Sequence, residues 1–407
     1  MAKSNLIAGL DIGTGHIKLL VVKQKEDQPG FEVVSQLKET SFGVRKGVVI
    51  DTEKVSRIIQ ILLNRAREET GQKINAVFTN IGGSHLSCVS SRGMIAVSRA
   101  DQKISEMDVA RVIESAKTVS LPSNSQIMEV YPKEFIVDNN DGVKEAIGMH
   151  GGRLEVETMV LACFTPYLNN LTQAILASDL RILDVVPSSL ASAEAVLTPK
   201  QKELGAAILD IGAGTSELAI FEEGELVHLV VFPMGSANIT NDIAIGLKTD
   251  IDTAEVIKIE KGSCSFKGSD KKEKVEVEGE DTLIFSQKML SRIIEARVSE
   301  IFGEVQKELK KIQKQGMLPA GIVLTGGGSR TPKIVDLAKK ELKLPCRIGK
   351  PMDFYGLEED LNYATSCGLI MRGMRGSNRS LSISSSNWTE KTKFVDRFKK
   401  ILKVFIP

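Results

Sequence analysis

The sequence predicts an α/β protein built from two similar halves. The first observation is an internal repeat, in which GLDIGTGHIKLL at residues 9–20 returns as ILDIGAGTSELA at residues 208–219. The offset is constant, so that Asp11 aligns with Asp210 and Gly13 with Gly212. The second observation is that strand-like and helix-like segments alternate in each half, which is typical of α/β sheets. A duplicated half-chain unit explains both observations.

The composition excludes several other classes of protein. With 407 residues, 42% of them hydrophobic and 26% charged, the chain is an ordinary globular protein of two or three domains. The 53 basic and 52 acidic residues nearly cancel, so whole-chain charge gives no case for nucleic-acid binding. Five dispersed cysteines without a CxxC pair indicate reduced thiols in a cytosolic protein. No signal peptide and no membrane span is expected.

The elements of the first half follow from periodicity and end signals. Each copy of the repeat is a strand, a tight glycine turn and a second strand. A helix is expected over residues 53–69, with Thr52 as N-cap and Gly71 as its end. The other expected elements are strands at 31–37, 74–81 and 181–186 and helices at 166–178 and 188–197, the last rich in small residues.

The second half repeats this plan, and each half carries an insertion. Its expected elements are hairpins within 206–232, a strand at 321–325 and helices at 332–342 and 363–373. The insertion at 237–318 holds an expected helix at 252–261, a charged hairpin at 274–285 and a long helix at about 286–314. The resulting domain prediction is a first domain (1–83, 161–204, 360–376) with the inserted subdomain 84–160, a second domain core (205–236, 319–359) with the inserted subdomain 237–318, a flexible linker (377–392) and a terminal helix (393–407).

The twin glycine turns predict a site for a polyphosphate. Without a Cβ, backbone N–H groups can approach phosphate oxygens. Asp11 and Asp210 head the two turns, and carboxylates that act through water suit Mg²⁺. Lys18 adds a point charge, and His16 is expected to offer its backbone N–H. One such motif alone more often marks a plain hairpin, but two in register, with a third glycine turn at 326–328, favour the site. The predicted phosphate- and adenosine-binding residues are Gly13, Thr14, Gly15, His16, Lys18, Gly212, Gly214, Thr215, Ser216, Gly235, Gly326, Gly327, Gly328 and Arg330.

These motifs resemble those of the actin-like ATPase superfamily rather than a Walker A or Rossmann fingerprint. AGLDIGTGHIKLLV and AAILDIGAGTSELAIF resemble its two phosphate loops, and GIVLTGGGSRTPKI resembles its adenosine motif. VVPSSLASAEAVL and YATSCGLIMRG resemble its two connecting helices. The resemblance implies an actin-like fold with ATP and Mg²⁺ in the cleft between the domains. It also implies that Glu255 and Lys258 face the ribose and adenine; without it they would be taken for a solvated helix face.

Within the superfamily the chain is most similar to the FtsA family of bacterial cell-division proteins. The first insertion follows INAVFTNIGG rather than preceding the helix at 53–69, and PAGIVLTGGGS and VVPSSLASAEAVLTP also match. The resemblance implies an ATP-binding filament protein at the division site, on the cytoplasmic face of the cell membrane, which tethers the tubulin-like FtsZ ring and meets other division proteins. It further implies that the subdomain 237–318 binds the C-terminal tail of FtsZ, for which Lys288, Arg292 and Arg297 are the expected cations.

The sequence leaves the chemistry and some alternatives open. No His or Glu in the phosphate motifs is placed to orient an attacking water. By analogy with actin, Gln173 on the expected helix 166–178 is the catalytic candidate. The expectation is therefore at most slow ATPase activity, with ATP acting as an assembly ligand. The alternatives are a PilM-like protein of type IV pilus assembly and, with less support, a sugar kinase or a chaperone-type ATPase.

The last residues predict a helix that lies on a membrane surface. A Ser-rich stretch precedes them and is a linker by composition. Read as a helix, the segment has an apolar face and a cationic face, which is typical of interfacial helices, although packing back on the body is the alternative. The membrane-contact residues expected are Phe394, Val395, Phe398, Ile401, Leu402 and Phe405 on the apolar face and Lys399, Lys400 and Lys403 beside it.

Overall fold

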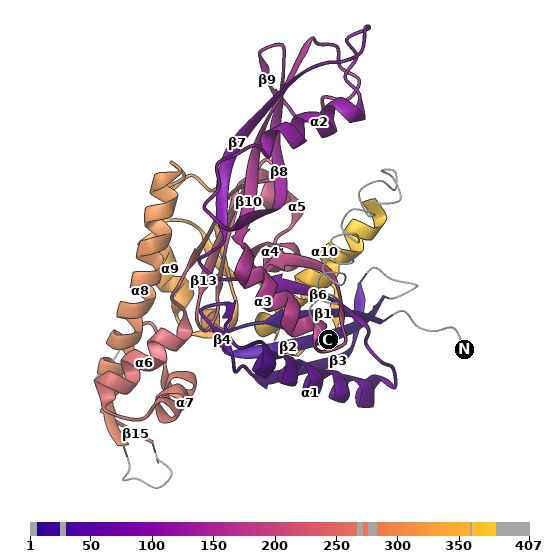
Figure 1. The fold of residues 1–407 in the computed structure, drawn as a ribbon. Coiled ribbons are helices and arrows are strands. Elements are labelled where there is room, and N and C mark those ends of the chain that lie inside the picture. Colours follow the sequence, from indigo (N-terminus) through magenta and orange to yellow (C-terminus); the bar gives the residue numbers. More distant parts are fainter. Residues whose placement is uncertain (1–5, 25–29, 267–271, 276–282, 359, 380–407) are drawn as a thin grey trace.

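Two sheets of the same plan form the centre of the molecule (Figure 1). The computed structural model describes residues 6–24, 30–266, 272–275, 283–358 and 360–379. The first sheet, in the order β11-β6-β1-β2-β3-β19, contains β1 (Leu6–Ile12), β2 (His16–Gln24), β3 (Phe31–Thr40), β6 (Ala76–Ile81), β11 (Arg181–Pro187) and β19 (Phe354–Tyr355). The second, in the order β14-β13-β12-β17-β18, contains β12 (Ala206–Ile211), β13 (Ser216–Glu222), β14 (Glu225–Phe232), β17 (Ile322–Thr325) and β18 (Cys346–Ile348).

The predicted duplication is confirmed by the hairpins of the two sheets. In each half an antiparallel hairpin, β1-β2 or β12-β13, is joined on one side by a parallel strand, β6 or β17. The two turns also close alike. The N–H of Gly13 donates to the carbonyl of His16 (3.1 Å), and the N–H of Gly212 donates to the carbonyl of Thr215 (2.9 Å).

The helix predicted at residues 53–69 forms α1 (Thr52–Thr70) and covers one face of the first sheet. The prediction of Thr52 as the N-cap is wrong by one residue. The N-cap is Asp51, whose carboxylate accepts the hydrogen bond from the N–H of Lys54. Gly71 ends the helix as predicted, in the left-handed region at φ 69°. The buried face contains Val55, Ile58, Ile59, Leu62 and Ala66.

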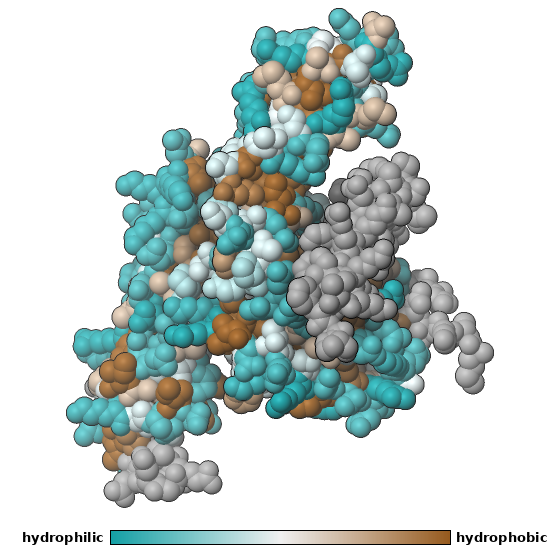
Figure 2. Space-filling view, viewed as in Figure 1, coloured by the Kyte–Doolittle hydropathy of each residue, from teal (hydrophilic) through white to brown (hydrophobic). Residues whose placement is uncertain are grey.

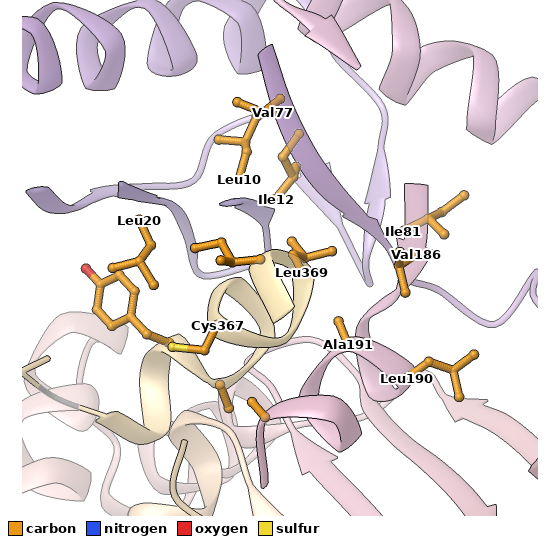
Figure 3. Close-up of a cluster of buried hydrophobic side chains, with 14 of the residues drawn as sticks. Leu10, Ile12, Leu20, Val77, Ile81, Val186, Leu190, Ala191, Cys367 and Leu369 are labelled. Atoms are coloured by element: carbon orange, nitrogen blue, oxygen red, sulfur yellow. The ribbon is translucent and has the colours of Figure 1, made fainter. Parts of the chain in front are cut away.

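Two connecting helices, α4 (Ser188–Val196) and α10 (Ala364–Arg379), cross between the sheets. They approach so closely that a Cβ on Gly368 would lie 1.6 Å from the carbonyl oxygen of Ala191. The small residues of both helices therefore allow the two helices to pack this closely. Figure 3 shows how side chains from α4, α10 and strands of the first sheet gather in one core cluster.

The first insertion forms a separate four-stranded sheet in the order β7-β10-β8-β9, which projects from the body (Figure 1). Its elements are β7 (Ser87–Ala96), α2 (Glu106–Ala116), β8 (Ser125–Val137), β9 (Asn140–Val143) and β10 (Arg153–Phe164). The outer part of this sheet packs on α2 around a small core of its own, which includes Val112, Leu154 and Val156. The inner ends of the strands, at Leu161 and Cys163, belong to the main core.

The second insertion lies beside the second sheet and is mainly helical. It contains α6 (Ser236–Leu247), α7 (Ile251–Lys261), β15 (Lys272–Val275), β16 (Leu283–Ser286) and α8 (Gln287–Lys311). The remaining elements are α3 (Thr165–Leu176), α5 (Pro199–Leu204), α9 (Ile334–Leu342), β4 (Val44–Arg45), β5 (Val48–Val49) and 3₁₀ turns at Gly327–Arg330 and Asp360–Tyr363. The helices α5 and α6 were not predicted. Within the described ranges, no helix has the length and apolar character needed to cross a bilayer. The predicted terminal helix at 393–407 lies outside the described residues.

Candidate nucleotide site

The two glycine turns of the repeat meet face to face. A Cβ on Gly15 would lie 2.9 Å from the Cβ of Ala213, and a Cβ on Gly214 would lie 2.7 Å from the side chain of Thr14. Any larger residue at either glycine would push the halves apart. The two turns therefore lie directly against each other where the two domains meet.

A buried polar network holds the first turn. Asp11 is only 5% exposed; its Oδ2 accepts from Lys18 Nζ (2.8 Å) and its Oδ1 from Asn80 Nδ2 (2.9 Å). The Oδ1 of Asn80 in turn accepts from the N–H of Ile12 (2.7 Å). Asn80 was not among the predicted site residues. The available signal was a polar residue at the carboxyl end of a buried strand, where ligands bind in α/β sheets.

Asp210, at the head of the second turn, is tied to both connecting helices. It is 8% exposed, and its Oδ2 accepts from the hydroxyl of Ser192 on α4 and from that of Thr365 on α10 (3.4 Å). Burial raises the pKa of Asp210, and the nearby charge of Asp11 acts in the same direction. Asp210 therefore belongs at once to the turn and to the crossing that joins the domains.

Glu217, which was not among the predicted site residues, is a third buried carboxylate of the site. It lies opposite Asp210 in the β12-β13 register and is 3% exposed. Its Oε2 accepts from the N–H of Ser189 (3.0 Å) in the first turn of α4. Burial, aided by the charge of Asp210, raises the pKa of Glu217 to about 8. The helix N-terminus partly compensates a negative charge at this position.

The networks of the two domains join at the start of α4. The hydroxyl of Ser188 accepts from Asn80 Nδ2 (3.1 Å) and donates to the carbonyl of Ile81 (3.3 Å). The next residue, Ser189, binds Glu217 of the other domain. The N-terminus of α4 thus contacts Asn80, which holds the first glycine turn, and Glu217, which lies beside the second.

The third glycine turn, Gly326–Gly328, lies directly beside Asp210. Gly326 has φ 82°, and a Cβ there would lie 2.2 Å from Asp210 Oδ1, so only glycine fits. A groove of about 500 Å³ opens where this turn ends. Arg330 is exposed at this groove. The residues that line it combine cations with apolar side chains, and they include Arg330, Lys333, Ile334, Ile348, Lys350 and Leu361.

The start of α6 packs on the second glycine turn. Gly235 is the N-cap, and the N–H groups of Ser236 and Ala237 donate to the carbonyls of Gly212 and Ala213 (2.9 Å each). At the start of β13, the strand that follows this turn, the hydroxyl of Ser216 donates to the carbonyl of Met234 (2.9 Å).

Glu255 and Lys258 of α7 lie against the N-terminal part of α6. Lys258 Nζ donates to Thr240 Oγ1 (2.8 Å) and lies 2.5 Å from a carboxylate oxygen of Glu255. The structure thus brings this predicted pair to the side of the second glycine turn.

Some predicted residues are not brought to this site. Gln173 is exposed, and it lies two residues from Leu171, which lines a small cavity with Ile12 and Asn80. Two residues correspond to about 200° around a helix. The side chain therefore lies on a different face of α3 from Leu171, and the catalytic role of Gln173 stays a prediction.

The three predicted cations Lys288, Arg292 and Arg297 lie on α8, in the second insertion. Arg297 binds both carboxylate oxygens of Asp242 (2.6 and 2.9 Å) and also Glu300, so it ties α8 to α6 within the insertion. Arg292 is exposed. The predicted membrane-contact residues Phe394–Phe405 lie outside the described part of the chain.

Comparison with known proteins places the chain in a family. The model of the family "Cell division protein FtsA" matches residues 207–368, and that of the "SHS2 domain inserted in FTSA" matches residues 83–162. The fold is similar to that of a PilM-PilN type IV pilus biogenesis complex (TM-score 0.66, 17% identity, 90% of this chain and 98% of that chain). It is also similar to MreB5 of Spiroplasma citri bound to ADP (TM-score 0.56, 14% identity, 93% and 98%). Both likenesses support an actin-like fold.

The curated relatives share much more sequence than these structures do. The cell division protein FtsA of Pseudomonas aeruginosa is 34% identical over 406 residues, which cover 97% of both chains. That of Bacillus subtilis is 33% identical over 378 residues (92% of this chain, 85% of that one), and that of Escherichia coli K12 is 30% identical over 381 residues (90% of both). The chain therefore belongs to the FtsA family of cell division proteins.

Proposed function

We propose that this chain binds ATP with Mg²⁺ between its two glycine turns and uses the bound state to assemble on the cytoplasmic face of the cell membrane at the division site. The observation that carries the proposal is the direct approach of Gly15 to Ala213 and of Gly214 to Thr14. Bare backbone N–H groups from both domains suit a polyphosphate held between them. MreB5, which shares the fold, has been solved bound to ADP and to AMPPNP.

The side chains at the site fit a magnesium nucleotide. Three buried carboxylates, Asp11, Asp210 and Glu217, lie at the site, and Lys18 pairs with Asp11. Burial raises the pKa values of Asp210 and Glu217, and the charge of a neighbouring aspartate adds to each shift, so a bound cation would be favoured here. Asp11 and Asp210 would hold the ion through water, and Lys18 would bind a phosphate. The ion, when bound, neutralises phosphate charge. Glu255, Lys258 and Arg330 would border the nucleoside.

Self-association is assigned to the inserted subdomain 84–160. The subdomain projects from the body and has exposed apolar side chains at Met94 on β7, at Met107 on α2 and at Ile147 between β9 and β10. A contact between this subdomain and a different surface of the next copy would not close on itself and would build filaments.

The second insertion is proposed to bind the C-terminal tail of FtsZ. Figure 2 shows hydrophobic surface over α6 and α7, where Ile245, Ile251 and Ile259 are 77%, 59% and 69% exposed. Exposed apolar patches of this kind mark interaction sites. Lys288 and Arg292 at the start of α8 supply positive charge for an acidic tail, whereas Arg297 is committed to Asp242 and positions α8.

A peptide-binding measurement tests this surface. Reversing the charge of Lys288 and Arg292 together is expected to weaken binding of an FtsZ tail peptide, and more so at low salt, because the pairs are screened by ions. Lys307→Glu on the exposed far end of α8 is the matched control and is expected to change nothing. Equal affinity of the double variant and the control would move the binding surface elsewhere.

Membrane attachment is assigned to residues 393–407. Read as a helix, the segment would place three Phe residues and three aliphatic residues on one face beside five cations, and each cation near an anionic surface contributes about 1 kcal/mol. A single copy would bind weakly, and a filament of many copies firmly.

A sedimentation experiment tests the proposal as a whole. With anionic vesicles, ATP and Mg²⁺, the chain is expected to co-sediment and to recruit FtsZ. Phe398→Glu should abolish sedimentation with lipid, and replacement of 84–160 by a Gly-Ser linker should remove filaments but keep nucleotide binding. Sedimentation of Phe398→Glu with lipid would refute the anchor, and filaments without 84–160 would refute the assembly contact.

A further inference from the structure

His85 lies at the junction between the first glycine turn and the inserted subdomain. It belongs to the short connection between β6, which ends at the site, and β7, which leads into the subdomain. Its Nδ1 accepts from the N–H of Phe164 (3.4 Å), the last residue of β10, which returns from the subdomain. Its ring also meets the edge of Tyr167 on α3, with ring centroids 5.0 Å apart. One side chain thus contacts both crossings into the insertion.

The second ring nitrogen of His85 is a buried donor. Because Nδ1 accepts a hydrogen bond, the neutral ring carries its proton on Nε2. Burial lowers the pKa of His85, which favours the neutral form. Nε2 is buried and has no hydrogen-bond partner among the described residues. Such donors are rare in folded proteins, because leaving one unsatisfied is costly.

A small cavity lies between His85 and the first turn. It measures about 10 Å³, and Ile12, Gly47, Asn80 and His85 are among its lining residues. This is close to the space that one water molecule needs. The Asn80 amide already donates to Asp11 and Ser188, but among the described residues its Oδ1 accepts from the N–H of Ile12 alone and keeps one free lone pair. Two residues that line the cavity thus carry an unsatisfied donor and an acceptor with a free lone pair.

We propose that one buried water bridges His85 Nε2–H and Asn80 Oδ1, which makes His85 a positioning residue for the first glycine turn. Asn80 holds both the carboxylate of Asp11 and the N–H of Ile12, so the bridge fixes the head of that turn. The same side chain holds the strands of the insertion. The bridge therefore couples nucleotide contacts at the turn to the placement of the inserted subdomain. Its effect on nucleotide affinity rests on the proposed function, whereas the water itself does not.

Two substitutions separate positioning from structure. In His85→Asn the side-chain oxygen still accepts from the N–H of Phe164, but the shorter side chain has no donor at the cavity. In His85→Gln an amide N–H reaches the former Nε2 position. His85→Asn is expected to weaken Mg-ATP binding by about tenfold or more, as the loss of outer-shell partners does, with thermal unfolding nearly unchanged. His85→Gln should recover most of the affinity. Equal affinity of His85→Asn and the unsubstituted protein would overturn the proposal.

Two further measurements on the unsubstituted chain do not depend on nucleotide. The chain has four histidines, so ¹⁵N-histidine spectra, assigned with His85→Asn, can report the tautomer of His85. The expected form carries its proton on Nε2, and a high-resolution crystal structure should show water density between Nε2 and Asn80. A proton on Nδ1 or an empty cavity would overturn the bridge. Failure of the unsubstituted protein to bind Mg-ATP would instead overturn the proposed function, and the tautomer and the density would still decide the bridge.

Discussion

Lys18 and Glu217 occupy the same position in the two copies of the duplicated hairpin, yet they carry opposite charge. Each is the cross-strand partner of the aspartate at the head of its turn, Lys18 of Asp11 and Glu217 of Asp210. In the first copy this position gives an ion pair of 2.8 Å. In the second it gives two buried carboxylates with raised pKa values. The duplication has thus become electrostatically asymmetric at the site.

Glu217→Gln is expected to flatten the pH dependence of stability. The pKa of Glu217 is raised from 4.5 to about 8, so between these values the folded state keeps a proton that the unfolded state has released. The free energy of unfolding then falls as pH rises through this window, by about 1.4 kcal/mol per pH unit for one group. The raised pKa of Asp210 adds a fall of the same sign.

Urea denaturation of nucleotide-free protein between pH 5 and 8 measures this effect. The glutamine oxygen can still accept from the N–H of Ser189, so the variant should fold. Parallel pH profiles for the two proteins would mean that Glu217 is ionised in the folded state throughout this range.

Gly368→Ala should destabilise the crossing of the connecting helices. The added methyl group would lie 1.6 Å from the carbonyl oxygen of Ala191, so α4 and α10 must separate. We expect the free energy of unfolding to drop by about 1–3 kcal/mol, the usual cost of overpacking. Gly303→Ala is the matched control, because a Cβ at that position of α8 meets nothing within 4 Å. It should stabilise the protein by about 0.5–1 kcal/mol. Similar effects of both changes in chemical denaturation would contradict the close crossing.

Arg372→Met should loosen the inserted subdomain from α10. Arg372 donates to Glu129 and to the hydroxyl of Tyr131 (3.2 Å) on β8, and its guanidinium lies 6.0 Å from the centre of the Tyr131 ring. Methionine keeps the apolar stem but loses these bonds, so the expected loss of stability is about 1–2 kcal/mol. Arg57→Met, which breaks an exposed pair with Glu53, should change stability by less than about 0.5 kcal/mol. Hydrogen exchange in β8 should accelerate only in Arg372→Met; unchanged exchange there would refute the contact.

Local signals explain why much of the fold could be predicted. Glycine turns between apolar runs and the buried face of α1 depend on residues close in sequence, and these predictions are confirmed. The unpredicted helix α6 lacks such a signal. Gly235 offers no side chain as a cap, and the first N–H groups of the helix bond to Gly212 and Ala213, far back in the chain. Tertiary contacts, not sequence punctuation, begin this helix.

The residues that hold the two glycine turns in place were not predicted, for a related reason. Asn80, Ser188 and Glu217 act through partners on other elements, and only the assembled fold brings them together. The repeat offered one signal, since Glu217 aligns with Lys18. The exposure of Gln173 could not be predicted for the same reason, because the sequence predicts the helix but not which of its faces packs on the body.

Calorimetric titration of the full chain with Mg-ATP tests the central claim most directly. The account predicts saturable binding of one nucleotide, weakened at least tenfold in Asp210→Ala and much less sensitive to that change when EDTA replaces Mg²⁺, because Asp210 acts through the ion. Gln173→Ala, at an exposed position of α3, should bind like the unsubstituted protein. Circular dichroism would establish that each variant is folded. Unchanged Mg-ATP affinity in folded Asp210→Ala, or no binding by the unsubstituted chain, would contradict a nucleotide site between the twin turns.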